Sequence, residues 1–233
     1  MQVYLERPSL RREAEFIRAV RRSRSLHRGF VTAPTAPAAY RNYLAVLRRR
    51  DQEAFFVILA ESQALAGVVT IDDIARGSFQ SANLGYYSLV PHAGKGYMRQ
   101  GVELALEHCF RELRLHRLEA NVQPANERSI ALVASIGFRK EGLAIGFAKV
   151  AGRWRDHERW AMLASEWRAR RRRDRGEHAR VERHREVRGR DRLERAPDRS
   201  APGTTGRARG RRVVRELDCP DRGTPFLAIP GRN

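Results

Sequence analysis

The sequence lacks several features that would identify other classes of protein. It has no run of about 18 apolar residues, so we expect no membrane-spanning helix and no membrane partner. Cys109 and Cys219 are its only cysteines, and neither stands in a CxxC or Cys/His cluster. This spacing supports neither a disulfide framework nor a metal site. The N-terminus lacks the cationic start and apolar core of a secretory signal, so we expect a cytoplasmic protein.

Positive charge is abundant but unevenly distributed. The formal net charge is +19 over 233 residues, and residues 168–233 alone contain 21 Arg, no Lys and 10 acidic residues. High charge with little apolar content predicts disorder. We therefore divide the chain into a folded domain over 1–167 and an arginine-rich, disordered extension over 168–233. Such an extension attracts RNA weakly through charge alone, although an unfolded segment without that role is the simpler interpretation.

Hydrophobic periodicity predicts one α/β domain. Helices are expected from residue 9, over 40–50, from residue 96 and over 126–136, and in the first of these Leu10, Ala14, Ile17 and Val20 share a face. The expected strands are 2–6, 53–60, 65–72, 83–90, 116–122, 138–150 and 153–163. The strand–helix–strand unit over 83–122 predicts one parallel pair with a right-handed crossover. The remaining strands are expected to pair antiparallel.

The stretch "SLVPHAGKGYMRQGV", Ser88–Val102, reads as a strand end, a glycine-containing loop and the first turn of a helix. Gly94 and Gly96 leave backbone N–H groups open at the helix start, where an anion such as phosphate is favoured. The two glycines also suit a purely structural turn.

Four segments resemble one family: "RGSFQSANLGY", "GKGYM", "HRLEANVQPANERSIALVASIGFRKEG" and "GRWRDH". Through them, nearly all of residues 1–163 resembles the GNAT-fold N-acetyltransferases, and most closely the ribosomal-protein-alanine N-acetyltransferases of the RimJ type. The resemblance implies a mixed sheet with a splayed central parallel pair, flanked by helices. It also implies direct transfer of an acetyl group from acetyl-CoA to the N-terminal α-amine of a protein, such as a ribosomal protein beginning with Ala or Ser, by a monomer or homodimer.

The resemblance also implies where acetyl-CoA binds. The donor would lie in the wedge where strands 83–90 and 116–122 diverge, with a β-bulge near Ser88–Val90 freeing an N–H for the thioester oxygen. Asn126 caps the following helix and also contacts the pantetheine arm. The implied donor-binding residues are Ser88, Leu89, Val90, Ala93, Gly94, Lys95, Gly96, Tyr97, Met98, Asn126 and Ser129.

The loop departs from the family pattern at two positions. Ala93 stands where the family has Gln or Arg, and Met98 stands where it has Gly or Ala, although Met is common there in the RimJ branch. His92 and Lys95 are the candidates to supply charge in place of the side chain missing at Ala93.

The catalytic candidates are Glu119, Tyr86 and Asn121, with Asp72, Tyr87 and His116 as further candidate bases. Each has a simpler interpretation as a surface or packing residue. Val133 occupies the position of the Tyr that many relatives use as the acid, so a water or another Tyr has to serve. In the "WRDH" segment, Trp154, Asp156 and His157 favour a structural role, with Asp156 orienting His157 and Trp154 near the peptide groove.

Two other functions remain open. The same fold acetylates small-molecule amines in some relatives, and the high positive charge suits a non-catalytic RNA- or ribosome-binding protein on this scaffold.

Overall fold

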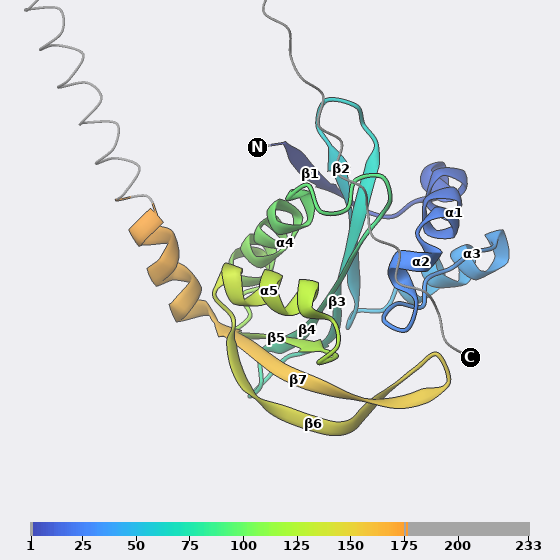
Figure 1. The fold of residues 1–233 in the computed structure, drawn as a ribbon. Coiled ribbons are helices and arrows are strands. Elements are labelled where there is room, and N and C mark those ends of the chain that lie inside the picture. The colour runs from blue at the N-terminus through green and yellow to red at the C-terminus, as the bar shows by residue number, and fades with distance from the viewer. Residues whose placement is uncertain (1, 175, 177–233) are drawn as a thin grey trace, which may run out of the picture. The chain divides into compact units, whose positions relative to one another are not determined.

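The computed structural model describes residues 2–174 and 176. Within them, seven strands form one sheet in the order β1-β2-β3-β4-β5-β7-β6 (Figure 1). The strands are β1 (Val3–Glu6), β2 (Glu53–Leu59), β3 (Leu65–Ala75), β4 (Ser81–Ser88), β5 (Arg117–Val122), β6 (Arg139–Val150) and β7 (Arg153–Leu163). The helices are η1 (Leu10–Arg12), α1 (Glu13–Arg22), α2 (Arg24–His27), α3 (Pro37–Val46), α4 (Tyr97–Glu107), the π-helical turn η2 (His108–Glu112) and α5 (Glu127–Ile136).

The parallel pair and its splay are as the sequence predicts. β4 and β5 pair in parallel and all other neighbours pair antiparallel. The parallel pairing lasts only from Ser81↔Arg117 to Asn83↔Glu119. Beyond it, β4 continues to Ser88 and β5 to Val122 as separate strands. A wedge therefore opens between their C-terminal halves.

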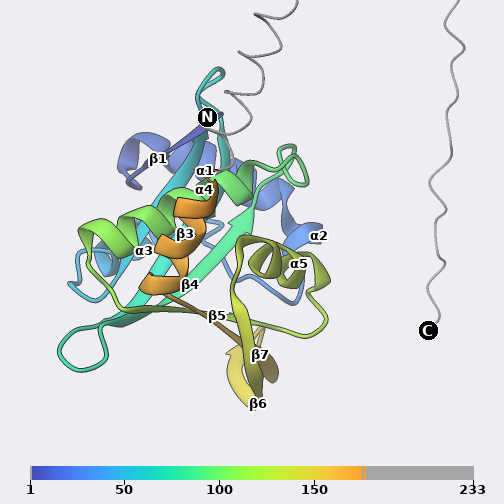
Figure 2. The ribbon, with the colours of Figure 1, turned by 90° about the vertical axis from the view of Figure 1, so that its left-hand side faces the viewer.

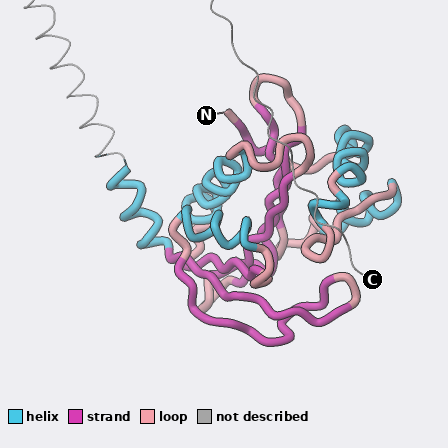
Figure 3. Tube along the Cα trace, in the orientation of Figure 1, coloured by secondary structure: helices cyan, strands magenta, loops and turns pink. Residues whose placement is uncertain are grey.

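Helices cover both faces of the sheet (Figure 3). One hydrophobic cluster joins α4 and α5 to alternate strand residues such as Val69 and Ile71. A second cluster joins α1 and α3 to the opposite face through Phe56, Ile58 and Val68. Strand side chains alternate between faces, so Gly85, Tyr87 and Asn121 belong to the second face.

Two details of the N-terminal region differ from the prediction. Of the four residues predicted to share a face, Ile17 and Val20 are buried, whereas Leu10 and Ala14 are exposed, and Phe16 completes the buried face of α1. The short helix α2 was not predicted, because its four residues contain a single aliphatic side chain and show no period.

A helix over residues 164–174 follows β7, so the predicted boundary at Trp167 falls inside a helix. Trp167 is only 7% exposed and lies 5.5 Å from the Phe110 ring, centroid to centroid. The guanidinium carbons of Arg111 and Arg171 lie 5.7 and 5.8 Å from the Trp167 ring. Figure 2 shows this helix, in orange, beside α4. The predicted disorder and RNA contact over 177–233 lie outside the described residues.

Candidate functional site

The loop before α4 has the geometry of an anion site. Gly94 and Gly96 adopt φ of +80° and +81°, a left-handed conformation that favours glycine. Gly96 is the N-cap of α4, no side chain caps the helix, and its first turn contains no acidic residue. A Cβ at either glycine would meet no atom within 4 Å. The first N–H groups of α4 thus face open space, where the helix dipole favours negative charge.

Met98 does not fill this space, although the family has a small residue at its position. The side chain of Met98 is buried against the sheet, and its Sδ lies 2.1 Å from where a Cβ on Gly67 would stand. The absence of a side chain on β3 at Gly67 therefore accommodates the larger residue and keeps the anion site open.

A cleft of about 950 Å³ runs from this loop along β4 to α5. Seven of the predicted donor-binding residues line it: Ser88, Ala93, Gly94, Gly96, Met98, Asn126 and Ser129. Asn126 caps α5 as predicted, since its side chain accepts a hydrogen bond from the Ser129 N–H at 3.3 Å. The other four predicted residues, Leu89, Val90, Lys95 and Tyr97, do not line the cleft.

The end of β4 turns Ser88 toward the wedge. The Leu89 N–H donates to the Ala66 carbonyl at 2.9 Å and the Val90 N–H donates to Ser23 Oγ at 3.0 Å. Because hydrogen-bonded pairs alternate along an antiparallel ladder, the backbone groups of Ser88 point away from β3. The Ser88 carbonyl accepts from His27 Nε2 at 2.8 Å.

The expected bulge at Ser88–Val90 is absent. The β3–β4 register is regular from Gly67↔Ser88 to Asp72↔Asn83, and its irregularity lies at the far end, between Asp72 and Ala75. Divergence from β5, rather than a bulge, frees the backbone groups of β4.

The positive charge near the cleft comes from residues that were not predicted. Arg99 and Arg128 line the cleft, whereas Lys95 does not. Burial and the neighbouring Lys95 lower the pKa of His92 below its usual value, with a smaller opposite effect from Glu15. His92 is therefore neutral at physiological pH and does not replace the side chain missing at Ala93.

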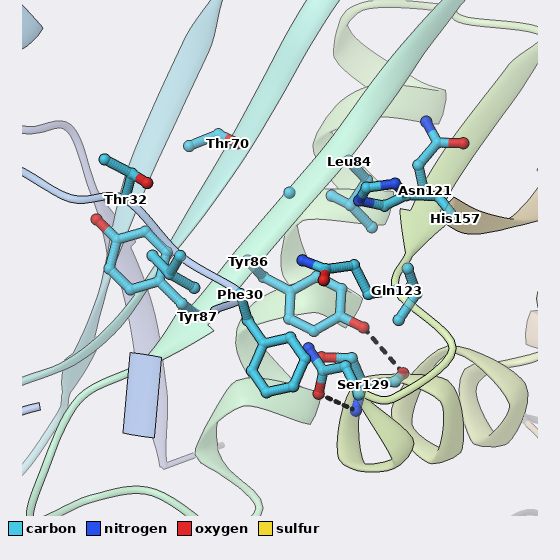
Figure 4. A pocket seen from close by; sticks show the side chains of 14 residues that line it. Phe30, Thr32, Thr70, Leu84, Tyr86, Tyr87, Asn121, Gln123, Ser129 and His157 are labelled. Carbon is cyan, nitrogen blue, oxygen red and sulfur yellow. Dashed lines mark hydrogen bonds between the residues drawn. The ribbon is translucent and has the colours of Figure 1, made fainter. Parts of the chain in front are cut away.

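A second cavity of about 260 Å³ adjoins the cleft (Figure 4). It lies on the second face of the sheet, between β4, β5 and the segment after α2. Six residues line both spaces: Phe30, Val31, Tyr86, Tyr87, Asn126 and Ser129. The two cavities therefore meet at Tyr86 and the start of α5.

Tyr86 occupies this junction. Its hydroxyl donates to the Ser129 carbonyl at 3.0 Å, and burial raises the pKa of Tyr86 to about 12, with that hydrogen bond acting in the opposite direction. The phenol is therefore protonated at physiological pH, and its one proton points to the Ser129 carbonyl. Val133 is fully buried in the core and takes no part in the site.

Asn121 and His157 line the smaller cavity but not the larger cleft, and Figure 4 shows them side by side. Asn121 Nδ2 donates to Asn83 Oδ1 at 3.0 Å, while Asn121 Oδ1 is buried and has no hydrogen-bond partner. His157 is buried, and its Nδ1 lies 3.0 Å from the Arg155 carbonyl oxygen.

Glu119 is placed unfavourably for a base. It lines neither cavity and is paired with Arg117, at 2.9 Å, and with Arg159. Burial alone would raise the pKa of Glu119, but hydrogen bonds from these two arginines outweigh it and hold the pKa below its usual value. The candidate base His116 is exposed at the opposite end of β5.

Asp72 and Tyr87 lie closer to the site. Thr70, which lines the smaller cavity, donates to Asp72 Oδ2 at 2.7 Å. Burial raises the pKa of Asp72 above its usual value, and the bond from Thr70 partly offsets this. Tyr87 lines both cavities, and burial raises its pKa well above the usual value.

The "WRDH" segment is arranged differently from the prediction. Asp156 accepts from the Gly146 N–H at 2.7 Å across the β6–β7 hairpin, and His157 is held by the Arg155 carbonyl instead. Trp154 is 68% exposed and lines neither cavity. Within the described residues, no group of three or more His, Cys, Asp or Glu side chains could hold a metal, and no helix is both long and apolar enough to cross a membrane.

Comparison with known proteins identifies relatives for most of the described region. Residues 2–139 match the acetyltransferase (GNAT) domain family. A Bacillus subtilis protein named "Probable N-acetyltransferase YjcK" is 38% identical over 52% of this chain and 67% of its own length. The [ribosomal protein uS5]-alanine N-acetyltransferase of Escherichia coli is 36% identical over 46% of this chain, and the match spans only 55% of that relative.

Two further matches bear on ligands. The spermidine N(1)-acetyltransferase of Vibrio cholerae is 29% identical over 50% of this chain and 67% of its own length. Among solved structures, Mycobacterium smegmatis RimJ in complex with CoA-disulfide superposes with a TM-score of 0.66 at 28% identity, covering 70% of this chain and 83% of that one.

Proposed function

The chain belongs to the acetyltransferase (GNAT) domain family, and on that premise we propose that it moves the acetyl group of acetyl-CoA to the N-terminal α-amine of a protein. The observation that carries this proposal is the meeting of two cavities at Tyr86, one of which begins at an uncapped helix start. A donor with a pyrophosphate and an acceptor with an amine can thus approach each other from different sides.

Acetyl-CoA suits the larger cleft. The open N–H groups at α4, with Arg99 and Arg128 nearby, would bind the pyrophosphate. The pantetheine arm would then follow β4 past Ser88, whose backbone groups face the wedge. A fixed N–H at that point would stabilise the negative charge that builds on the thioester oxygen during attack.

The reaction needs little acid–base assistance. An unperturbed α-amine has a pKa of about 8, so a sizeable minority is neutral at physiological pH and able to attack. The new N–C bond forms as the C–S bond breaks, the amine loses a proton, and the CoA thiolate gains one. Tyr86, protonated and at the junction, is our candidate for the donor to the thiolate, once its hydroxyl turns from the Ser129 carbonyl.

The acceptor that we favour is a ribosomal protein beginning with Ala or Ser. Support comes from the E. coli relative that acts on uS5 alanine and from the RimJ structure. The spermidine N(1)-acetyltransferase supports a second candidate, acetylation of a polyamine.

A panel of acceptors separates these functions. The full chain is incubated with acetyl-CoA and peptides that differ only in their first residue, or with spermidine, and released thiol is followed. Turnover that is highest for Ala and Ser peptides supports the proposal, and preferential turnover of spermidine supports the second candidate. A chain that binds no CoA by calorimetry would contradict both and leave a non-catalytic role.

A further inference from the structure

The amide of Asn121 has a defined orientation. Asn83 Nδ2 donates to Asp73 Oδ2 at 3.0 Å, and an ionised carboxylate only accepts, so Asn83 must present its oxygen to Asn121. Asn121 then presents Nδ2 to Asn83, at 3.0 Å, and keeps Oδ1 free. That oxygen is buried and without a partner at the edge of the smaller cavity. Buried acceptors are nearly always satisfied, which indicates a ligand that donates a hydrogen bond.

The tautomer of His157 is defined in the same way. A backbone carbonyl only accepts, so the Arg155 carbonyl fixes the proton of the neutral ring on Nδ1. Nε2 is then an acceptor. β5 and β7 pair with Asn121 opposite Arg159, and His157 precedes Arg159 by two residues. His157 is therefore the diagonal neighbour of Asn121 on the same face of the sheet, as Figure 4 shows.

We propose that Asn121 and His157 form the binding site for the acceptor amine, with His157 also receiving its proton. This inference rests on the proposed acetyl transfer. A neutral primary amine has two N–H donors and one lone pair. Asn121 Oδ1 and His157 Nε2 accept the two N–H bonds, and the lone pair remains for the thioester carbon.

The proton balance is complete. When the nitrogen attacks, it becomes cationic and passes one N–H proton to His157 Nε2, while the C–S bond breaks and the leaving thiolate takes the Tyr86 proton. The imidazolium keeps its Nδ1–H bond to the Arg155 carbonyl. After the products depart, it returns the second proton through solvent, which restores the Tyr86 phenol. A protonated ammonium could donate to the same two acceptors but has no lone pair, so only the neutral form of the amine attacks the thioester.

Paired variants of the full chain test each role. Asn121→Leu keeps the volume but removes the acceptor oxygen, and we expect the KM for an Ala-initiated peptide to rise about tenfold with CoA affinity unchanged. In His157→Asn, the shorter amide can still donate to the Arg155 carbonyl but leaves the Nε2 position empty, and we expect kcat to fall about 100-fold. His157→Gln instead places a non-basic amide near the Nε2 position, so we expect a KM close to that of the wild type and a kcat as low as in His157→Asn.

The control is His116→Gln, an equivalent change at the exposed end of β5, which should leave both constants unchanged. Folding and CoA binding are confirmed for each variant by thermal melting and calorimetry, and His157→Gln serves where His157→Asn does not fold. Folded variants with kcat and KM within about twofold of the wild type, or a loss of CoA affinity in parallel, would overturn the inference. Absence of turnover by the wild type with every amine would instead contradict the proposed function itself.

Discussion

Gly96, at the start of α4, is the residue through which the proposed donor site is most directly tested. Its φ of +81° is left-handed, and any other residue in that conformation costs about 1–2 kcal/mol of conformational free energy. A Cβ at this position would nevertheless meet no atom within 4 Å. We expect Gly96→Ala to reduce CoA affinity by about tenfold or less through that strain. Gly96→Glu adds a carboxylate at the proposed pyrophosphate site, and we expect CoA affinity to fall by about 100-fold or more in calorimetric titrations.

Gly152 provides the matched control for this pair. It has a φ of +82° and equally open surroundings, but it lies in the β6–β7 turn outside both cavities. Gly152→Glu should therefore carry the same strain without changing CoA affinity. Equal CoA affinity for Gly96→Glu and Gly96→Ala would place the phosphate site elsewhere.

Some residues of the candidate site could be predicted from the sequence and others could not. Gly94, Gly96 and Asn126 belong to local motifs whose function depends on neighbours in the chain, and all three line the cleft. His27 and Arg128 depend on tertiary contacts, because the packing of α2 and α5 brings them to the cleft that begins at α4. Glu119 shows the converse, since arginines on its own strand and on β7 occupy its carboxylate.

At the scale of elements, we expect the proposed donor site to depend on how closely α4 approaches β2. Gly101 is buried there, and a Cβ on it would lie 2.5 Å from Val57 Cγ2. Gly101→Ala therefore overpacks the interface, and we expect a loss of about 1–3 kcal/mol in the free energy of unfolding. Displacement of α4 should also weaken CoA binding, although Gly101 does not line the cleft. Urea unfolding and calorimetry measure the two effects.

The double variant shows whether this contact is responsible. Val57→Ala removes both methyl groups, after which the nearest remaining atom of residue 57 would lie 3.3 Å from the new Cβ. Gly101→Ala combined with Val57→Ala should be more stable than the sum of the single effects predicts. Strict additivity would mean that the glycine serves another purpose.

The sequence predicts helices and strands correctly where the hydrophobic period is clear or a glycine marks the end of a helix. The crossover over 83–122 predicts the parallel pair, and the glycine at 137 ends α5 in a left-handed conformation as expected. The helix over 164–174 was missed because its charged sequence gives no amphipathic period. It is held instead by one aromatic residue, Trp167, and by arginines that stack on that ring.

For the whole molecule, this last helix extends the packed part of the described chain beyond Trp167. Arg170 donates to the Ser135 carbonyl at 2.9 Å and takes the space left by Gly137, where a Cβ would lie 2.6 Å from its guanidinium. Arg171 pairs with Glu107 at 3.3 Å and stacks on Trp167. These contacts join the segment after β7 to both α4 and α5, the two helices that border the cleft.

Two truncations test this boundary. A chain ending at residue 176 retains every cleft-lining residue and these contacts, so we expect it to acetylate as the full chain does. A chain ending at Trp167 loses Arg170, Arg171 and most of the helix that holds the indole in place. Its melting temperature should fall by about 2–10 °C, because partly buried cation–π and ion-pair contacts contribute about 1–3 kcal/mol in sum. Equal melting temperatures for the two truncated chains would support the boundary predicted at Trp167. Loss of turnover in the chain that ends at residue 176 would show that residues 177–233 take part in the reaction.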